Sequence, residues 1–174
     1  WPTSPDDFDK LLETKVFTNG SDRDAVKALY RRMSQQQLGS VKLLDFDGMV
    51  PPNLADAQRL GRCLQLCSNL ESLWLNRLEL RGDTFRAMVA ELDAHSLPKL
   101  KTLVLKENSI GNEGVRALVR LSLDSVTRLS LVSNSIDDVG MQSLAAAIAA
   151  GKLPAVTAVG LEGLSLGDNP GDRA

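Results

Sequence analysis

Short runs of alternating apolar residues recur along the chain at a nearly constant interval. Residues 70–75, 100–105 and 126–131 align without gaps, and weaker copies begin at Val41 and Val156. The five runs start at positions 41, 70, 100, 126 and 156, in steps of 29, 30, 26 and 30 residues. Apolar residues at alternate positions place their side chains on one face of a short strand. The pattern therefore predicts five strands, one in each repeat.

The segments between these runs carry apolar residues at the spacing of one helix face. The apolar sets are Leu54, Ala57, Leu60, Leu64 and Cys67; Phe85, Met88, Val89 and Leu92; Val115, Leu118 and Val119; and Val139, Leu144 and Ile148. The predicted helix N-caps are Asn53, Asp83, Asn112 and Asp138, and residues suited to helix ends are Pro98, Gly151 and Pro154. One strand and one helix cannot bury their apolar faces alone, so we expect the units to stack.

The runs that start at positions 100 and 126 continue into Asn108 and Asn134, completing the pattern L-x-x-L-x-L-x-x-N-x-L. The pattern and its period resemble the leucine-rich-repeat family, and the long repeat is similar to its ribonuclease-inhibitor-like class. The resemblance implies an α/β fold, a leucine-rich-repeat solenoid with a curved parallel sheet on the concave side and helices on the convex side. It also implies that the asparagine amides satisfy backbone groups at the turn after each strand. Met49, Leu78 and Leu164 take the asparagine's place in the other copies.

We expect residues 1–40 to form an N-terminal helical cap and residues 41–174 to form about five repeat units, the last one incomplete. Ser4 followed by Pro5 is a strong helix start, because serine caps a helix and proline fits its first turn. A second helix starts near Ser21. Phe8, Leu11 and Leu12 of the first helix are expected to face inward, and the second helix carries the apolar residues Val26, Leu29, Tyr30 and Met33. Terminal repeats need such polar-faced caps for solubility.

The last repeat fits the pattern in two registers. Its apolar positions are Val156, Val159 and Leu161 in the first register, or Leu161, Leu164, Leu166 and Asn169 in the second. We favour the first register, because the Leu-Pro pair at 153–154 mirrors the pair at 97–98 ahead of an earlier strand. Either register leaves an apolar edge open, which implies truncation or a partner contact near Leu164 and Leu166.

Composition narrows the function classes. A net charge of -2 and a pI of about 5.4 argue against nucleic-acid binding, which needs a strongly basic surface. The longest apolar run, residues 144–150, covers roughly a third of a membrane-spanning helix, so we expect no membrane insertion. Cys63 and Cys67 lie four apart on one helix face, where we expect both to be buried. The cytoplasm is the favoured compartment, or an organelle if a targeting segment has been removed.

The residues expected to bind a partner are those at the outward positions of the strands and the loops that follow them. They are Asp45, Asp47, Trp74, Asn76, Arg77, Val104, Lys106 and Arg128. Trp74 is central to this set, because tryptophan and arginine are enriched among the residues that dominate interface energies. The centre column of outward positions is expected to run through positions 45, 74, 104, 130 and 160.

Motifs for catalysis or cofactor binding are missing from the sequence. Asp83 in Arg81-Gly82-Asp83 is explained by helix capping, and residues 45–48 resemble the start of a calcium loop whose later ligands are missing. His95 has no nucleophile near it in sequence, and with two cysteines it makes no metal-ligand set. We therefore expect no enzyme, cofactor or metal, but a protein–protein interaction module that binds a protein or peptide on its concave face. The alternative is a structural subunit or fragment of a larger assembly, held through its open C-terminal edge.

Overall fold

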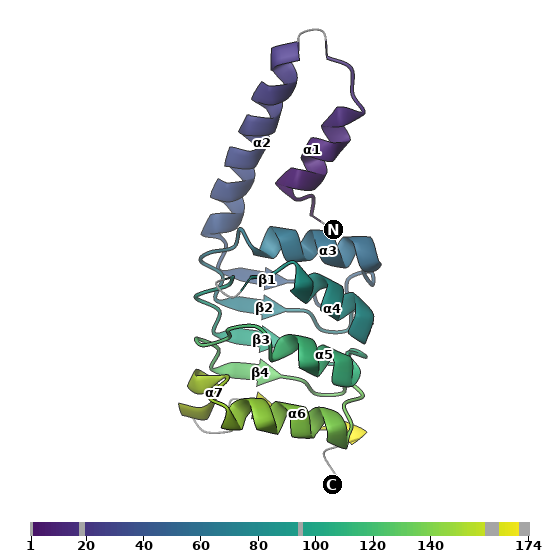
Figure 1. The fold of residues 1–174 in the computed structure, drawn as a ribbon, viewed down its shortest axis with the longest axis vertical. Helices are drawn as coiled ribbons and strands as arrows, with labels where there is room; N and C mark the ends of the chain where they lie inside the picture. The colour runs from purple at the N-terminus through teal and green to yellow at the C-terminus, as the bar shows by residue number, and fades with distance from the viewer. Residues whose placement is uncertain (1, 18–19, 94–95, 159–163, 171–174) are drawn as a thin grey trace.

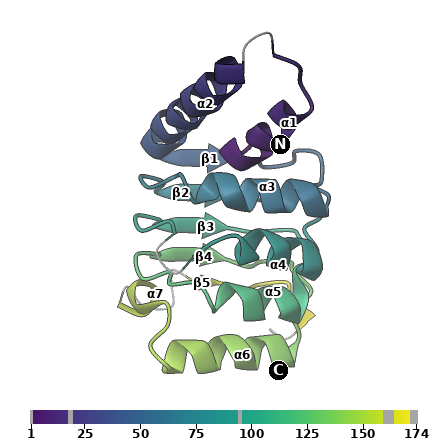
Figure 2. The same cartoon turned by 45° about the horizontal axis from the view of Figure 1, so that its top comes forward.

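The computed structural model describes residues 2–17, 20–93, 96–158 and 164–170. It is built around a parallel sheet whose five strands follow one another in chain order. The strands are β1 (Leu43–Asp45), β2 (Ser72–Trp74), β3 (Thr102–Val104), β4 (Arg128–Ser130) and β5 (Leu164–Ser165). The helices between them are α3 (Leu54–Leu64), α4 (Gly82–Ala90), α5 (Gly111–Leu118), α6 (Asp138–Ala149) and α7 (Pro154–Ala158). Helices α3 to α6 stack side by side along one face of the sheet, which confirms the predicted α/β solenoid (Figures 1 and 2).

The core is a set of aliphatic rows that run across the strands. Leu44, Leu73, Leu103 and Leu129 pair in register, and Leu164 continues the row on β5. A second row comes from the last apolar position of each run and is fully buried at Leu75, Leu105 and Leu131. The helices close the core from one side with the apolar residues of their inner faces. Burial of these side chains is the main source of stability, at about 1.5–3 kcal/mol for each large aliphatic residue before ordering costs.

Buried asparagines join consecutive repeats at the turns that follow the strands. The Oδ1 atom of Asn108 accepts hydrogen bonds from the backbone N–H groups of Leu78 and Leu80, at 3.0 and 3.1 Å. Its Nδ2 atom donates to the carbonyl oxygens of Leu75 and Leu105, at 2.7 and 2.9 Å. One amide thus satisfies four buried backbone groups in two repeats, so leucine at position 78 is tolerated because the next repeat supplies the donor and acceptor.

The favoured register of the last repeat is wrong, and the second register is the one the chain adopts. Leu164 on β5 pairs with Leu129, whereas Val156 lies in helix α7; Val159 and Leu161 fall outside the described residues. Asn169 explains the choice. Its Oδ1 atom accepts hydrogen bonds from the backbone N–H groups of Asn134 and Ile136, at 2.8 and 3.0 Å. The asparagine position of the last repeat is therefore 169, not 164.

The two Leu-Pro pairs share a backbone conformation, but the chain takes a different path after each of them. Leu97 and Leu153 both have left-handed backbone conformations, with φ values of 58° and 55°. After Leu97 the chain makes a short turn and reaches β3, whereas after Leu153 it enters α7. The same two-residue signal can precede either path, because the partner across the sheet decides where the next strand forms.

The helix starts agree with the sequence in part. Asn53 caps α3 through a reciprocal pair of hydrogen bonds with Asp56, as predicted. Asp83, Asn112 and Asp138 lie inside their helices instead, and the cap positions are Arg81, Ile110 and Asp137. Leu54 and Val139 were expected in the core, but their exposed fractions are 53% and 51%. Both lie in the first turn of a helix, and the buried residues begin later, at Ala57 in α3 and at Gly140 in α6.

Helices α1 (Pro5–Glu13) and α2 (Gly20–Ser40) form a hairpin that projects beyond the β1 end of the sheet (Figure 1). Ser4 caps α1, and Phe8 stacks on Tyr30 with ring centroids 3.8 Å apart. Leu12 is buried, but the expectation that Leu11 faces inward is wrong, since it is half exposed; Leu29 and Met33 on α2 are exposed to a similar extent. Two packed helices contact each other along one side only, so apolar residues on their other sides face solvent. That residues 1–40 act as a terminal cap stays a prediction.

Candidate functional site: the open face of the sheet

None of the described helices packs on one face of the sheet (Figures 1 and 2). Because side chains alternate along a strand, the leucines that point to the helices leave their neighbours pointing the other way. These neighbours are Leu43, Asp45, Ser72, Trp74, Thr102, Val104, Arg128 and Ser130, and we call the surface they define the open sheet face. The predicted centre column is confirmed from Asp45 to Ser130. Ser165 follows Ser130 in register, so the fifth member is not Gly160, which lies outside the described residues.

Trp74 lies in the middle of this column, between Asp45 on β1 and Val104 on β3. The exposed fraction of Trp74 is 39%, whereas Val104, the other apolar residue of the column, is half-buried. Neighbouring strands are about 4.8 Å apart, so the indole lies within reach of the side chains on both sides. Trp74 and Val104 therefore form an apolar patch among polar neighbours, and no described helix covers it.

A charged pair lies beside the tryptophan, where the chain leaves β1 and β2. The Nε and Nη2 atoms of Arg77 are both 3.0 Å from the Oδ1 atom of Asp47. Arg77 has a φ of 53°, and the equivalent positions Gly48, Glu107 and Ser133 have φ values of 66°, 56° and 55°. This left-handed turn recurs in successive repeats and sends the side chains that follow the strands outward in a regular series.

The remaining predicted residues lie farther along the same surface. Asn76 accepts a hydrogen bond from the backbone N–H of Lys106 at 2.9 Å, and the ammonium of Lys106 pairs with Glu107 at 3.1 Å. Arg128 is exposed, and its guanidinium makes no ion pair with any residue in the described ranges. Arg128 lies on β4, two strands from β2, and is aligned with Thr102 on β3, so it does not adjoin Trp74.

A ladder of opposite charges runs along the start of the strands. Glu71 accepts a hydrogen bond from Lys101 at 2.8 Å and lies 3.7 Å from the ammonium of Lys42. The hydrogen bond and the positive charge of Lys101 hold the pKa of Glu71 below its usual range, and Lys42 adds to this effect. These exposed pairs contribute little to stability, but they place fixed charges of both signs near the strands that carry Trp74 and Val104.

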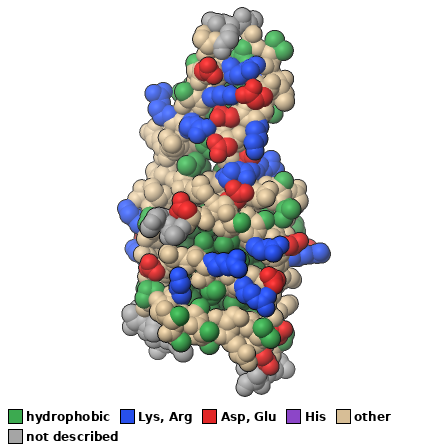
Figure 3. All heavy atoms as spheres, in the orientation of Figure 1, with side chains coloured by type: hydrophobic (Ala, Val, Ile, Leu, Met, Phe, Trp, Pro, Cys, Tyr) green, Lys and Arg blue, Asp and Glu red, His purple; other side chains and the backbone are tan. Residues whose placement is uncertain are grey.

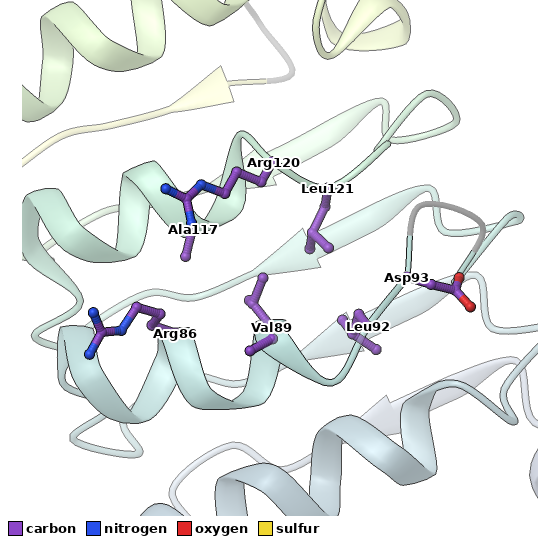
Figure 4. A pocket seen from close by; sticks show the side chains of 8 residues that line it. Arg86, Val89, Leu92, Asp93, Ala117, Arg120 and Leu121 are labelled. Atoms are coloured by element: carbon purple, nitrogen blue, oxygen red, sulfur yellow. The ribbon is translucent and has the colours of Figure 1, made fainter.

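The sequence did not reveal a second concave feature on the helical side. A groove of about 190 Å³ opens between α4 and α5. In that region of Figure 3, apolar side chains lie beside several Lys and Arg side chains, and Figure 4 shows the residues that line the groove. Its residues are spread over two repeats about 30 positions apart, so no local motif announces it.

In the part of the chain that the structure describes, no three His, Cys, Asp or Glu side chains are arranged to hold a metal ion. His95 lies outside that part. Cys63 and Cys67 are buried with free thiols, as predicted. None of the described helices is both long and apolar enough to cross a membrane.

Comparison with known proteins supports the repeat architecture. A family model described as "Leucine Rich repeat" matches residues 96–119 and 124–145, which contain β3 with α5 and β4 with the start of α6. No curated protein sequence matched the chain. One similar solved structure is described as "Leiomodin-1 Actin-Binding Site 2 (ABS2)". It is 12% identical, with a TM-score of 0.46, and the match covers 59% of this chain and 60% of that one.

Two repeats match the leucine-rich-repeat family model, and the recurring sequence pattern and the strand–helix solenoid give the chain a leucine-rich-repeat architecture. The chain spans less than two thirds of the leiomodin structure that it matches. Its assignment to the ribonuclease-inhibitor-like class stays a prediction.

Proposed function

We propose that this chain works by binding another protein and that the partner docks on the open sheet face around Trp74. Leucine-rich repeats serve as protein-interaction modules, so the general function follows from the fold and the matched repeats. The particular face and its central residue are our proposal. In this proposal the protein performs no chemistry of its own.

The exposure of Trp74 is the observation that carries the proposal. A large amphipathic side chain in the centre of a sheet gains most from burial by a second surface. Val104 extends the apolar area on one side, and the Asp47–Arg77 pair and the Glu71 ladder supply charges around it. An apolar centre with a polar rim is the usual anatomy of a protein interface.

The alternative is attachment through the C-terminal edge of the sheet. Leu164 and Leu166 are half-buried and pack against the core, so they expose less apolar surface than the sequence indicated. In the described residues, β5 pairs only with β4. The edge remains a competing proposal, and the experiment below separates it from the open sheet face.

The test compares partner capture by the 174-residue chain, its Trp74→Ala variant and a Val139→Ala control. Val139 on α6 is an apolar residue with 51% exposure, on the helical side of the molecule. Retained proteins are identified by mass spectrometry, and the dissociation constant of the purified partner is then measured for all three chains. We expect Trp74→Ala to weaken binding by about tenfold or more, as for a central aromatic contact, and Val139→Ala to have no effect.

Equal affinity of the Trp74→Ala variant and the parent chain would overturn the proposal for the open sheet face. Loss of the same partner in a Leu166→Lys variant, with binding retained by Trp74→Ala, would favour the C-terminal edge. Thermal unfolding of each variant shows whether a loss of binding reflects a loss of fold.

A further inference from the structure

The groove between α4 and α5 lies on the side of the sheet opposite the proposed docking face. Its floor is apolar, formed by Val89 and Leu92 from one repeat and Leu121 from the next. Arg86 and Arg120 stand at its rim on the two sides (Figure 4). The groove is therefore shared between two repeats and has a mixed apolar and cationic lining.

The packing of the two helices explains why the groove forms where it does. At the start of α4, Gly82 approaches the backbone of the next repeat so closely that a Cβ atom would lie 2.8 Å from the carbonyl oxygen of Ile110. The groove opens at the other end of the helices, where their last turns present Ala90 and Ala117. Small side chains there leave space that bulky ones would fill.

The charges along the groove have a direction. In Figure 4 the guanidinium groups of Arg86 and Arg120 both lie toward one end, Asp93 lies at the other end, and the apolar side chains lie between them. Within the described ranges, neither of these guanidinium groups forms an ion pair or a hydrogen bond, whereas Arg116 nearby is paired with Glu113. Two arginines held without acidic partners beside an apolar floor complement a ligand that carries both a carboxylate and an apolar group.

The size of the groove selects among ligands of this kind. Sites for drug-sized molecules and cofactors usually have volumes of about 300–1,000 Å³, and this groove has about 190 Å³. It is also open to solvent along α4 and α5, so it suits one or two side chains of a larger molecule. A segment of a protein partner meets these requirements.

We propose that the α4–α5 groove is a second interaction site, which binds a short segment of a partner protein in which an acidic side chain lies close to a bulky apolar one. The apolar side chain contacts Val89, Leu92 and Leu121, and the carboxylate lies at the Arg86 and Arg120 end. This site is independent of the open sheet face, and it permits one chain to hold two partners on opposite sides.

The experiment is a selection from a displayed library of random 12-residue peptides on the full 174-residue chain. Selected peptides are synthesised and their dissociation constants measured for the parent chain and for a variant that combines Arg86→Glu with Arg120→Glu. Both arginines are exposed, so the fold should persist, and circular dichroism with thermal unfolding checks this. A control combines Arg32→Glu with Lys152→Glu, which changes the net charge equally at exposed positions that do not line the groove.

We expect the selected peptides to share an acidic residue within a few positions of a leucine-like or aromatic one. Their affinity should fall about tenfold or more in the Arg86→Glu/Arg120→Glu variant and stay unchanged in the control. An Ala90→Trp variant covers the groove from an exposed position on α4 and should weaken the same peptides without altering the arginines.

The proposal would be overturned if no peptide is selected, if the selected peptides lack acidic residues, or if their affinity is equal for the parent chain and the charge-reversed variant. Peptides that lose affinity in Trp74→Ala but not in Arg86→Glu/Arg120→Glu would also overturn it. That last outcome would support the open sheet face, so the two proposals can fail separately.

Discussion

Arg62 on α3 makes a two-pronged ion pair with Asp7 on α1, with its Nη2 atom 2.8 Å from Oδ1 and 3.0 Å from Oδ2. The Nη1 atom of the same arginine lies 3.2 Å from Glu91, just after α4. Ser4 adds a hydrogen bond to Asp7 at 2.5 Å. Arg62 therefore ties the N-terminal hairpin to the first two repeats, across 55 positions of sequence.

The attachment of the hairpin should depend on pH through Asp7. Burial by itself raises the pKa of Asp7, but the hydrogen bonds from Ser4 and Arg62 together lower it below the ordinary value of 3.8. A carboxyl group with a lowered pKa stabilises the folded state above its unfolded pKa, and this contribution disappears as the pH falls through the folded value. Backbone amide NMR shifts of α1 and α3, followed from neutral pH downward, should report loss of the contact below about pH 3.8.

The matched variants for this titration are Asp7→Asn and Asp22→Asn. Asp7→Asn should remove the pH dependence at the α1–α3 contact. Asp22 lies in the first turn of α2 and forms no ion pair with the described residues, so its substitution should leave that dependence unchanged. Unaltered α1 shifts in an Arg62→Met variant would contradict the assigned role of the ion pair.

Asn108→Ala should destabilise the fold by roughly 3 kcal/mol or more, because it leaves several buried backbone groups without partners. Chemical denaturation measures the free energy of unfolding. Asn76 is a suitable control, since it is half-buried on the open sheet face and accepts a single hydrogen bond, from the backbone of Lys106. Asn76→Ala should cost about 1 kcal/mol or less. Equal losses in the two variants would contradict the role given to the buried amide.

Gly61→Ala should lower the free energy of unfolding by about 2 kcal/mol, because α3 and α4 are in contact at this residue. A Cβ atom at Gly61 would lie 2.3 Å from the carbonyl oxygen of Met88, which belongs to the backbone and cannot rotate away. At Gly39 in α2 the nearest atom to an added Cβ is 3.7 Å away, so Gly39→Ala should be neutral or stabilise by up to about 1 kcal/mol. Similar effects of the two substitutions on thermal unfolding would show that the α3–α4 contact is not close.

Cys63 and Cys67 should be unreactive in the native protein. Burial raises the pKa of Cys63 to about 11, with a contribution from the negative charge of Asp7, and burial raises the pKa of Cys67 to about 12. The thiolate is the reactive form, so both thiols should resist a chromogenic disulfide reagent near neutral pH and react once denaturant unfolds the chain. Rapid reaction of either thiol without denaturant would contradict the buried placement.

Some elements could be predicted because their signal is local and repeated. Leu73, Leu103 and Leu129 were expected on one buried row, and the strands pair them in register. Trp74 was expected to point away from the core, and it lies exposed on the open sheet face. The apolar residues at every second position of a run show which side of the strand faces the core. The same alternation occurs in each repeat, so each repeat predicts the same orientation.

Other predictions were wrong where the local pattern fits two positions and a contact with a distant repeat decides between them. Residues 156–161 and 161–166 both satisfy the strand pattern, and the hydrogen bonds of Asn169 to the previous repeat select the second. The capping residues of three helices were misplaced by one or two positions, since the turn before each helix also has to satisfy the neighbouring repeat. For example, Asn112 has a good cap side chain, but it bonds Asp137 in the next repeat instead.

The sequence alone determined the architecture of this protein, because each repeat carries its own apolar frame and stacking is the only way to bury it. It also determined which strand residues face outward, since alternation follows from the geometry of a strand. Tertiary structure decided the register of the last repeat, the docking of the hairpin through Arg62, and the groove between α4 and α5. Each of these depends on side chains about 30 or more positions apart that meet only when the repeats are stacked.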